Sequence, residues 1–309
     1  MIHCVVSSGR IHDDADMKIG LLITREQMNR PNTVIPEVIR HLSERDASVD
    51  VIYPEEQLIS FSSIRVRHDL YLLKCHNGLG LSLGGALDAA GATILNPYLS
   101  SLTTQNRILA TSVLKAAGIP IPPSWFTIDP PLAKAVANRT PLIVKPYARH
   151  KTSDVRVINS PKDLEGFSSL ADPVLIQKYV KKSPEDLKVY VVGERTFPVR
   201  KVYSPDRRDL MGRECTVSEA IREIALKCGK LLRLGLYGVD FIEGPDGPVV
   251  IDVNWFPGYR GARNVSSVLA DYIYAYGRGR YDLDRPVEAA RVSPATQPER
   301  DGMEAPWLG

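Results

Sequence analysis

Cysteine is scarce in this chain of 309 residues, and its four copies lie far apart. Cys4, Cys75, Cys215 and Cys228 form no Cys-x-x-Cys pair and show no zinc-site spacing, so reduced thiols are expected rather than disulfides or a structural metal. No apolar run approaches the roughly 20 residues of a membrane-spanning helix. The first residues also lack the basic and apolar regions of a secretory signal. These absences predict a cytoplasmic protein with no membrane segment.

Neither sign of charge dominates, because Lys and Arg number 39 and Asp and Glu 36, a net charge of +3. Aromatic residues make up only 7% of the chain, and Trp125, Trp255 and Trp307 are far apart. A nucleic-acid binder needs a basic stripe interleaved with aromatic side chains, so no nucleic-acid partner is expected. The hydrophobic share of 44% instead predicts an ordinary globular protein.

Strands and helices are predicted to alternate over the first third of the chain. Apolar runs typical of strands lie at 18–24, 47–54, 69–75 and 92–97. An amphipathic helix is predicted over 34–46, and a glycine-rich turn over 76–85 leads into a short helix at 86–91. This alternation predicts a parallel sheet, with ligands at the carboxyl ends of its strands.

A helix predicted over 103–117 and the proline-rich run after it mark a domain boundary near residue 120. The expected fold class is α/β with α+β lobes. We expect five segments: a disordered extension at 1–16, an N-terminal α/β domain at 17–119, a small central lobe at 120–182, a C-terminal lobe at 183–284 and a loose tail at 285–309.

The densest polar chemistry lies in a hairpin predicted over 238–261. Asp240 is on its first strand, and Asp252 and Asn254 are on its second. Residues two apart on a strand share a face, and cross-strand pairing can bring Asp240 beside the other two. Two carboxylates and an amide oxygen suit Mg²⁺, which also binds the phosphates of a nucleotide.

The pattern Asp…Asp-x-Asn-x-Phe-Pro-Gly on a terminal hairpin resembles the ATP-grasp superfamily. The resemblance covers residues 70–275 through several motifs in the expected order. It implies an ATP-grasp fold preceded by an N-terminal parallel-sheet domain, and an enzyme that uses ATP with one or two Mg²⁺ ions.

The resemblance also implies roles for individual residues. Lys145, in the strand PLIVKPY, corresponds to a lysine that contacts ATP phosphate, and Arg107 occupies the place of an earlier basic ATP contact. The segment Gln177, Lys178, Tyr179 and Val180 resembles the hinge that holds the adenine edge. The implied metal ligands are Asp240, Asp252 and Asn254, and the implied catalytic residues are Lys145, Asp252 and Arg200.

Two branches of the superfamily compete for the reaction class. Inositol 1,3,4-trisphosphate 5/6-kinases phosphorylate a ring hydroxyl, and Asp252-Val253-Asn254 and the position of His150 resemble them. Lys188 falls in a segment whose lysine contacts substrate phosphate, and Arg200 and Gly258 complete the implied substrate contacts. RimK-type and glutathione-synthetase-like ligases instead activate a carboxylate for attack by an amine, and LNPYLSS and LKAAGIPIPPSW resemble those ligases.

We therefore expect phosphoryl transfer from Mg-ATP to an anionic small molecule, with a slight preference for an inositol-phosphate kinase. A RimK-type carboxylate–amine ligase is the alternative, with an amino acid or peptide carboxylate and an amine as substrates. A non-catalytic nucleotide-binding regulator is the second alternative. No oligomeric state is predicted.

Overall fold

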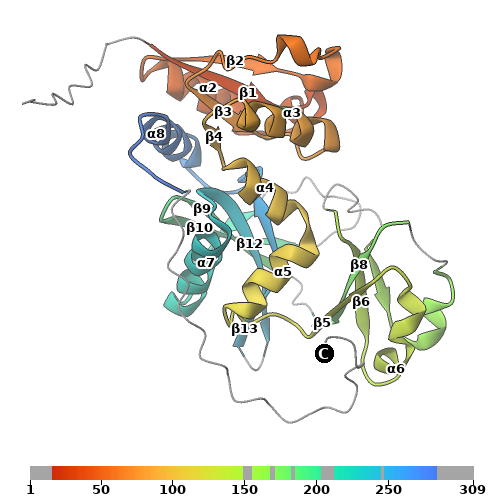
Figure 1. Cartoon of the computed structure of the whole chain (residues 1–309). Coiled ribbons are helices and arrows are strands. Elements are labelled where there is room, and N and C mark those ends of the chain that lie inside the picture. Colours follow the sequence, from red (N-terminus) through yellow and green to blue (C-terminus); the bar gives the residue numbers. More distant parts are fainter. Residues whose placement is uncertain are drawn as a thin grey trace, which may run out of the picture.

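Figure 1 shows the computed structural model, which describes residues 16–148, 155–167, 171–181, 185–202, 212–244 and 247–283. Within these ranges the strands form one parallel sheet of four strands and two antiparallel sheets of four and five strands. No helix in this part of the chain is long and apolar enough to cross a membrane.

The N-terminal sheet has the strand order β2-β1-β3-β4, with every pair parallel, as the sequence predicts. Its strands are β1 (Met17–Leu22), β2 (Ala47–Ile52), β3 (Leu70–Leu73) and β4 (Ile94–Leu95). The connections contain α1 (Arg25–Met28), α2 (Ile35–Ser43), η1 (Pro54–Glu56), η2 (Phe61–Ser63) and α3 (Gly78–Ala89). This crossover arrangement is what strands alternating with helices require.

Helix α3 differs from the prediction, because the glycine-rich stretch that reads as a turn is helical from Gly78. The Asn77 side chain caps this helix by accepting the Gly80 amide at 2.8 Å. A Cβ at Gly80 would lie 2.0 Å from the Cβ of Cys75, so glycine permits a close approach to the end of β3. The glycines therefore serve helix packing rather than a turn.

The helix predicted over 103–117 is two helices, α4 (Tyr98–Gln105) and α5 (Arg107–Ala116). The break falls at Asn106, whose backbone is extended and whose side chain accepts the amides of Ile108 and Leu109 at 3.0 and 3.2 Å. Helix α4 contacts the last strand of the C-terminal sheet, β13 (Gly247–Trp255), and α5 contacts α7 (Glu219–Leu232). These two helices thus pack with the C-terminal lobe, although they precede residue 120.

The central lobe, at the right in Figure 1, is an antiparallel sheet with the strand order β5-β8-β6-β7. Its elements are β5 (Ser124–Thr127), η3 (Pro130–Ala133), α6 (Lys134–Ala137), β6 (Leu142–Pro146), β7 (Arg156–Ile158), η5 (Pro161–Leu164) and β8 (Val174–Lys178). The lobe has a small hydrophobic core of its own, centred on Leu142, Ile158, Leu164 and Ile176.

The C-terminal lobe contains the five-stranded sheet, in the order β11-β10-β9-β12-β13. Its remaining elements are β9 (Glu185–Val192), β10 (Arg195–Val202), β11 (Arg213–Glu214), β12 (Leu236–Gly244) and α8 (Val265–Gly277). The predicted hairpin is present as the antiparallel pair β12–β13. Helix α7 begins after Ser218, whose hydroxyl accepts the Ile221 amide.

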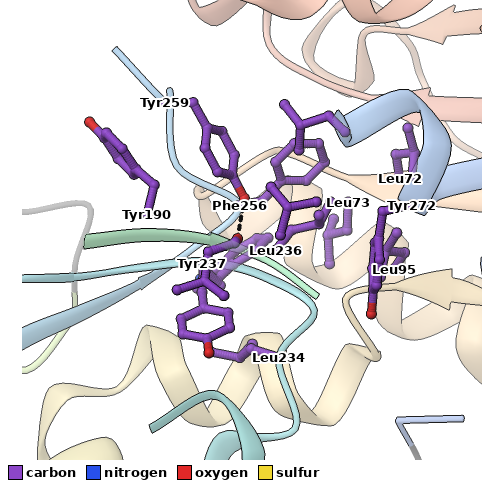
Figure 2. Packing of buried hydrophobic residues seen from close by; sticks show 14 of the residues in the cluster. Leu72, Leu73, Leu95, Tyr190, Leu234, Leu236, Tyr237, Phe256, Tyr259 and Tyr272 are labelled. Carbon is purple, nitrogen blue, oxygen red and sulfur yellow. Dashed lines mark hydrogen bonds between the residues drawn. The ribbon is translucent and has the colours of Figure 1, made fainter. Parts of the chain in front are cut away.

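One continuous hydrophobic core joins the N-terminal sheet to the C-terminal lobe. Figure 2 shows Leu72 and Leu95 of the N-terminal sheet beside Tyr272 of the C-terminal lobe, within the same core. Asn96 is fully buried at this junction, and its amide nitrogen donates to the Leu236 carbonyl at 2.8 Å. Its amide oxygen accepts the Gly235 and Leu236 amides, both at 2.8 Å. The two units are therefore fixed to each other by apolar burial and by Asn96.

We expect Asn96→Ala to lower the free energy of unfolding by about 2–4 kcal/mol, because it leaves three buried backbone groups without their partner. Urea unfolding would measure the loss. Asn138→Ala is the matched control, because Asn138 is exposed at the end of α6. A loss for Asn96→Ala no larger than that for Asn138→Ala would contradict this account of the junction.

Candidate functional site

The three acidic and amide side chains of the hairpin lie on one face of the C-terminal sheet. Asp240 on β12 is directly opposite Asp252 on β13, and Asn254 is opposite Gly238. Directly paired residues of antiparallel strands project from the same face, as do residues two apart. The Asn254 amide donates to Asp240 Oδ2 at 3.0 Å. The structure thus brings together the three side chains that the sequence suggested as metal ligands.

A β-bulge next to this cluster connects the two lobes. The register shifts between Asp240 and Phe241, so that Ile251 is an extra residue on β13. Lys145, at the end of β6 in the central lobe, donates to the Ile251 carbonyl at 3.1 Å and to Gln177 Oε1 at 2.8 Å. The bulge therefore provides an acceptor for a buried cation from the facing lobe, one residue from Asp252.

The predicted hinge segment, residues 177–180, begins with the last two residues of β8 and already makes hydrogen bonds within the protein. Gln177 is buried between Lys145 and Ser124, and its amide donates to the Ser124 hydroxyl at 3.0 Å. The Lys178 and Tyr179 amides donate to the carbonyls of residues 123 and 141 at 2.9 and 2.8 Å. These bonds fix the hinge backbone against β5 and the start of β6.

Arg107 is buried at the start of α5, beneath the strand end that carries Lys145. Its Nη1 donates to the carbonyls of Pro146 and Ala148 at 2.6 and 3.3 Å, and its amide donates to the Tyr147 carbonyl at 2.8 Å. The structure therefore places Arg107 where it holds the backbone that follows Lys145.

Lys188 on β9 lies beside the acidic cluster, directly opposite Asp240 across the β9–β12 pair. Its Nζ is 2.7 Å from Asp240 Oδ1. Burial disfavours the charged form, but Asp240, Tyr190 and Asp252 together outweigh it and raise the pKa of Lys188. Lys188 therefore keeps its positive charge at the edge of the cluster.

The structure separates Arg200 from this face. Arg200 pairs with Leu187 across β9–β10, whereas Lys188 pairs with Val199, so Arg200 and Lys188 project from opposite faces. The Arg200 guanidinium instead forms an ion pair with Glu243 at 2.6 Å. A one-residue difference in register thus turns the predicted catalytic and substrate contact away from the acidic cluster.

The neighbouring residue, Lys201, takes the place expected for Arg200. It pairs with Asp186, two residues before Lys188, and so shares the face of Lys188. Its Nζ donates to the Tyr190 hydroxyl at 2.9 Å. Register alone distinguishes Lys201 from Arg200, so the sequence contains no signal that favours it.

The other two predicted substrate contacts are His150 and Gly258. His150 lies outside the described residues. Gly258 is exposed in the loop that follows β13, next to Pro257.

Lys74, which the sequence did not single out, follows β3 and is only 7% exposed. Its Nζ donates to the carbonyls of Phe256 and, at 3.0 Å, Pro257, which immediately precede Gly258. Burial lowers the pKa of Lys74 to about 7. Its place at the carboxyl end of a parallel strand, where ligands tend to bind, is the signal that could have identified it.

Aromatic stacking on Trp255 also supports the end of β13. The His76 ring stacks on Trp255 with centroids 4.2 Å apart, and Trp255 Nε1 donates to Gln105 at 3.3 Å. The Gln105 amide donates to the His76 carbonyl at 3.0 Å. Burial raises the pKa of the adjacent Cys75 thiol to about 12, so Cys75 is not a thiolate nucleophile at neutral pH.

The donor set fits a hard cation such as Mg²⁺. The described residues contain no group of three or more His, Cys, Asp and Glu side chains suited to a metal. A metal here would therefore be held by the mixed set of Asp240, Asp252 and Asn254, whose oxygens are the ligands that Mg²⁺ prefers. Both oxygens of Asp240 already have partners, Lys188 and Asn254, so the ion would compete with Lys188 for Asp240.

A family model for the RimK-like ATP-grasp domain matches residues 104–275. A probable alpha-L-glutamate ligase from a Shewanella species is 22% identical over 271 residues, which cover 80% of this chain and 86% of the relative.

Two solved structures share the fold at low sequence identity. One is the D-alanine–D-alanine ligase from Bacillus anthracis in complex with ATP, with a TM-score of 0.67 and 19% identity, covering 85% of this chain and 98% of the other. The other is the ATP-grasp ligase PsnB in complex with a phosphomimetic variant of its minimal precursor, Mg and ADP. It has a TM-score of 0.62 and 19% identity, and covers 85% of this chain and 99% of the other.

We expect Lys74 to make the stability of the protein rise with pH between about 7 and 9, below the range in which the buried Cys75 and Cys228 thiols, whose pKa burial raises to about 12, act in the opposite direction. The unfolded lysine has its ordinary pKa of 10.5 and keeps its proton in this range, whereas the folded one, with a pKa of about 7, loses it. The free energy of unfolding should therefore increase by up to about 1.4 kcal/mol per pH unit from this group.

Lys74→Met should remove this slope, and urea unfolding at several pH values would measure it. Lys115→Met, at an exposed position on α5, should retain the slope of the parent. Parallel stability profiles for the parent and Lys74→Met would show that Lys74 keeps its proton in the folded state.

Proposed function

The chain belongs to the RimK-like ATP-grasp family, and we propose that it is a carboxylate–amine ligase that uses Mg-ATP. The observation that carries this proposal is the face formed by Asp240, Asp252 and Asn254, with Lys145 reaching it from the facing lobe. Carboxylates that can hold a phosphate-bound cation, opposite a buried lysine, suit phosphoryl transfer from a nucleotide.

The comparisons support the ligase reading and give no support to the inositol-kinase reading that the sequence slightly favoured. The alpha-L-glutamate ligase relative matches along most of its length, and the two structural neighbours also have ligase names. The Asp-x-Asn motif that resembles the kinases is compatible with a ligase, because Asp supplies the same hard oxygen to Mg²⁺ as Glu does.

The proposed reaction proceeds in two steps. A substrate carboxylate attacks the γ-phosphorus of ATP, which releases ADP and forms an acyl phosphate; an amine then attacks the acyl carbon, and phosphate leaves as the amide forms. Both steps build negative charge on oxygen, so fixed cations stabilise them. Lys145, Lys188 and Lys201 would supply that charge, and bound Mg²⁺ would neutralise the phosphates of the nucleotide.

The nucleotide would lie between β6–β8 and the β12–β13 hairpin. Lys145 would meet its phosphates, and the hinge at the end of β8 would meet its base. Because the Lys178 and Tyr179 amides already donate to protein carbonyls, Val180 is the hinge residue best suited to donate to the adenine edge. Arg107 would act indirectly, by holding the backbone after Lys145.

The acceptor is proposed to be a small anionic substrate, an amino acid or a peptide carboxylate. Lys188 and Lys201 lie on the sheet face of the acidic cluster, and both ammonium groups lie near the Tyr190 ring, at 5.7 and 5.5 Å from its centroid. Two cations beside one tyrosine suit a carboxylate better than a neutral group.

Turnover of Mg-ATP with two panels of acceptors would test the reaction class. One panel contains amino acids and short peptides with an amine donor, and the other contains inositol phosphates. We expect ADP, free phosphate and a new amide from the first panel. The Asp252→Asn variant should make none of these, because the metal site loses a charged ligand, whereas Asp50→Asn at an exposed site should act as the parent does. A stable phosphorylated inositol would refute the ligase proposal.

The adjacent residues Lys201 and Arg200 provide a matched pair of variants. We expect Lys201→Ala to lower kcat by about 100-fold, the typical cost of removing one group that stabilises developing charge. Arg200→Ala should stay within about twofold of the parent, because it removes only a partly exposed ion pair with Glu243. Steady-state kinetics would decide, and a larger loss for Arg200→Ala would mean that the other face of β10 takes part in catalysis.

A further inference from the structure

A cavity of about 890 Å³ lies apart from the acidic face, and none of the candidate site residues lines it. Its walls come from the carboxyl ends of α7 and α8, from the β9–β10 turn and from residues 280–283. This volume is within the range of pockets that bind small organic molecules. The proposed ligase reaction gives this cavity no role.

The cavity lining contains five cationic side chains and three carboxylates, and the carboxylates are those of Glu194, Asp271 and Asp282. Arg45 is neutralised by Asp271 at 2.6 Å. The other four cations are Arg195, Lys230, Arg233 and Arg280. Glu194 and Asp282 are the two carboxylates set against these four cations, so the cavity lining has an excess of two positive charges.

Arg233 is held in an unfavourable backbone conformation at this site. It caps α7 with φ 53° and ψ 48°, in the left-handed region where glycine is the usual residue. Its side chain is half-buried in the cavity wall. A position that glycine would fill with less strain carries a guanidinium instead, and such strain is typical of ligand sites.

The apolar part of the cavity wall is centred on Tyr272. Tyr272 is buried against two glycines, because a Cβ at Gly193 or Gly235 would lie 2.8 or 2.3 Å from its side chain. Tyr281 stacks on the Tyr272 ring with centroids 4.6 Å apart and is 48% exposed. The cavity therefore offers an accessible aromatic surface beside its cations.

The dipole of α7 accounts for some of the cations around the cavity but not for all of them. Cations are favourable at the carboxyl end of a helix, and Lys230 lies in the last turn of α7. Arg195 begins a strand, β10, where no helix end favours a cation. Cations therefore converge on the cavity from different kinds of element, which a single helix dipole would not produce.

We propose that this cavity is a second ligand site that binds a planar organic anion, a ring carrying a carboxylate, sulfonate or phosphate. The ring packs on Tyr281, which Tyr272 supports from behind, and the anionic group binds Arg233 with Lys230, Arg195 and Arg280 around it. Guanidinium groups bind such anions with paired hydrogen bonds, and aromatic side chains stack on planar rings. The site is independent of the proposed ligase reaction.

Anilinonaphthalene sulfonate is a suitable probe, because it combines aromatic rings with one sulfonate and fluoresces when bound. The full chain would be titrated with it in the presence of saturating Mg-ATP, so that the nucleotide cleft is filled. We expect saturable binding with a Kd below about 100 μM, weakened by salt. Absence of saturable binding up to about 1 mM would overturn the proposal.

Arg233→Gly removes the guanidinium while placing the residue that the backbone conformation favours. We expect this variant to bind the probe at least about tenfold more weakly and to keep or raise the Tm of the parent. Arg222→Ala is the matched control, because Arg222 lies on α7, pairs with Glu219 and does not line the cavity. Equal affinities for Arg233→Gly and the parent, or equal losses in both variants, would overturn the proposal.

Tyr281→Ala provides a second test, which removes the proposed stacking contact and leaves the cations in place. Tyr281 is exposed at the cavity, so its truncation should leave the fold intact. We expect weaker probe binding with an unchanged dependence on salt, because only the stacking contact is lost. Unchanged affinity in this variant would place the probe elsewhere on the protein.

Discussion

The pairing of β12 with β13 fixes the geometry of the acidic face, because it aligns Asp240 with Asp252 and places Asn254 on the same face. The bulge at Ile251 interrupts that ladder one residue from Asp252. The Ile251 carbonyl accepts a hydrogen bond from Lys145 of the central lobe. An irregularity in one strand thus couples the acidic face to the cation that opposes it.

The N-terminal sheet and the central lobe contact the C-terminal lobe in different ways. The N-terminal sheet shares a continuous hydrophobic core with the C-terminal lobe, and the buried side chain of Asn96 joins them through three hydrogen bonds. The central lobe has its own small core and meets the β12–β13 hairpin through polar contacts such as that of Lys145. Polar contacts exchange for ligand contacts at lower cost than a hydrophobic core can be opened, so ligand-dependent motion is expected at the central lobe.

Three lysines lie near the candidate site, of which Lys74 and Lys145 are buried and Lys188 is half-buried. Each offsets the cost of burial differently. Lys188 has a carboxylate partner, Asp240, which raises its pKa. Lys145 has the carbonyl of Ile251 and the amide oxygen of Gln177. Lys74 has only two carbonyl partners among its described hydrogen bonds, and burial lowers its pKa to about 7.

The sequence by itself determined the parallel N-terminal sheet, the terminal hairpin and the grouping of Asp240, Asp252 and Asn254. These follow from short-range periodicity, since alternation along a strand fixes which residues share a face. The tertiary structure decided where the glycine-rich stretch is helical, where Asn106 breaks a helix, and that Lys201 rather than Arg200 faces the acidic cluster. Such features depend on close approach and on strand register, and a shift of one residue reverses every face without changing the pattern in the sequence.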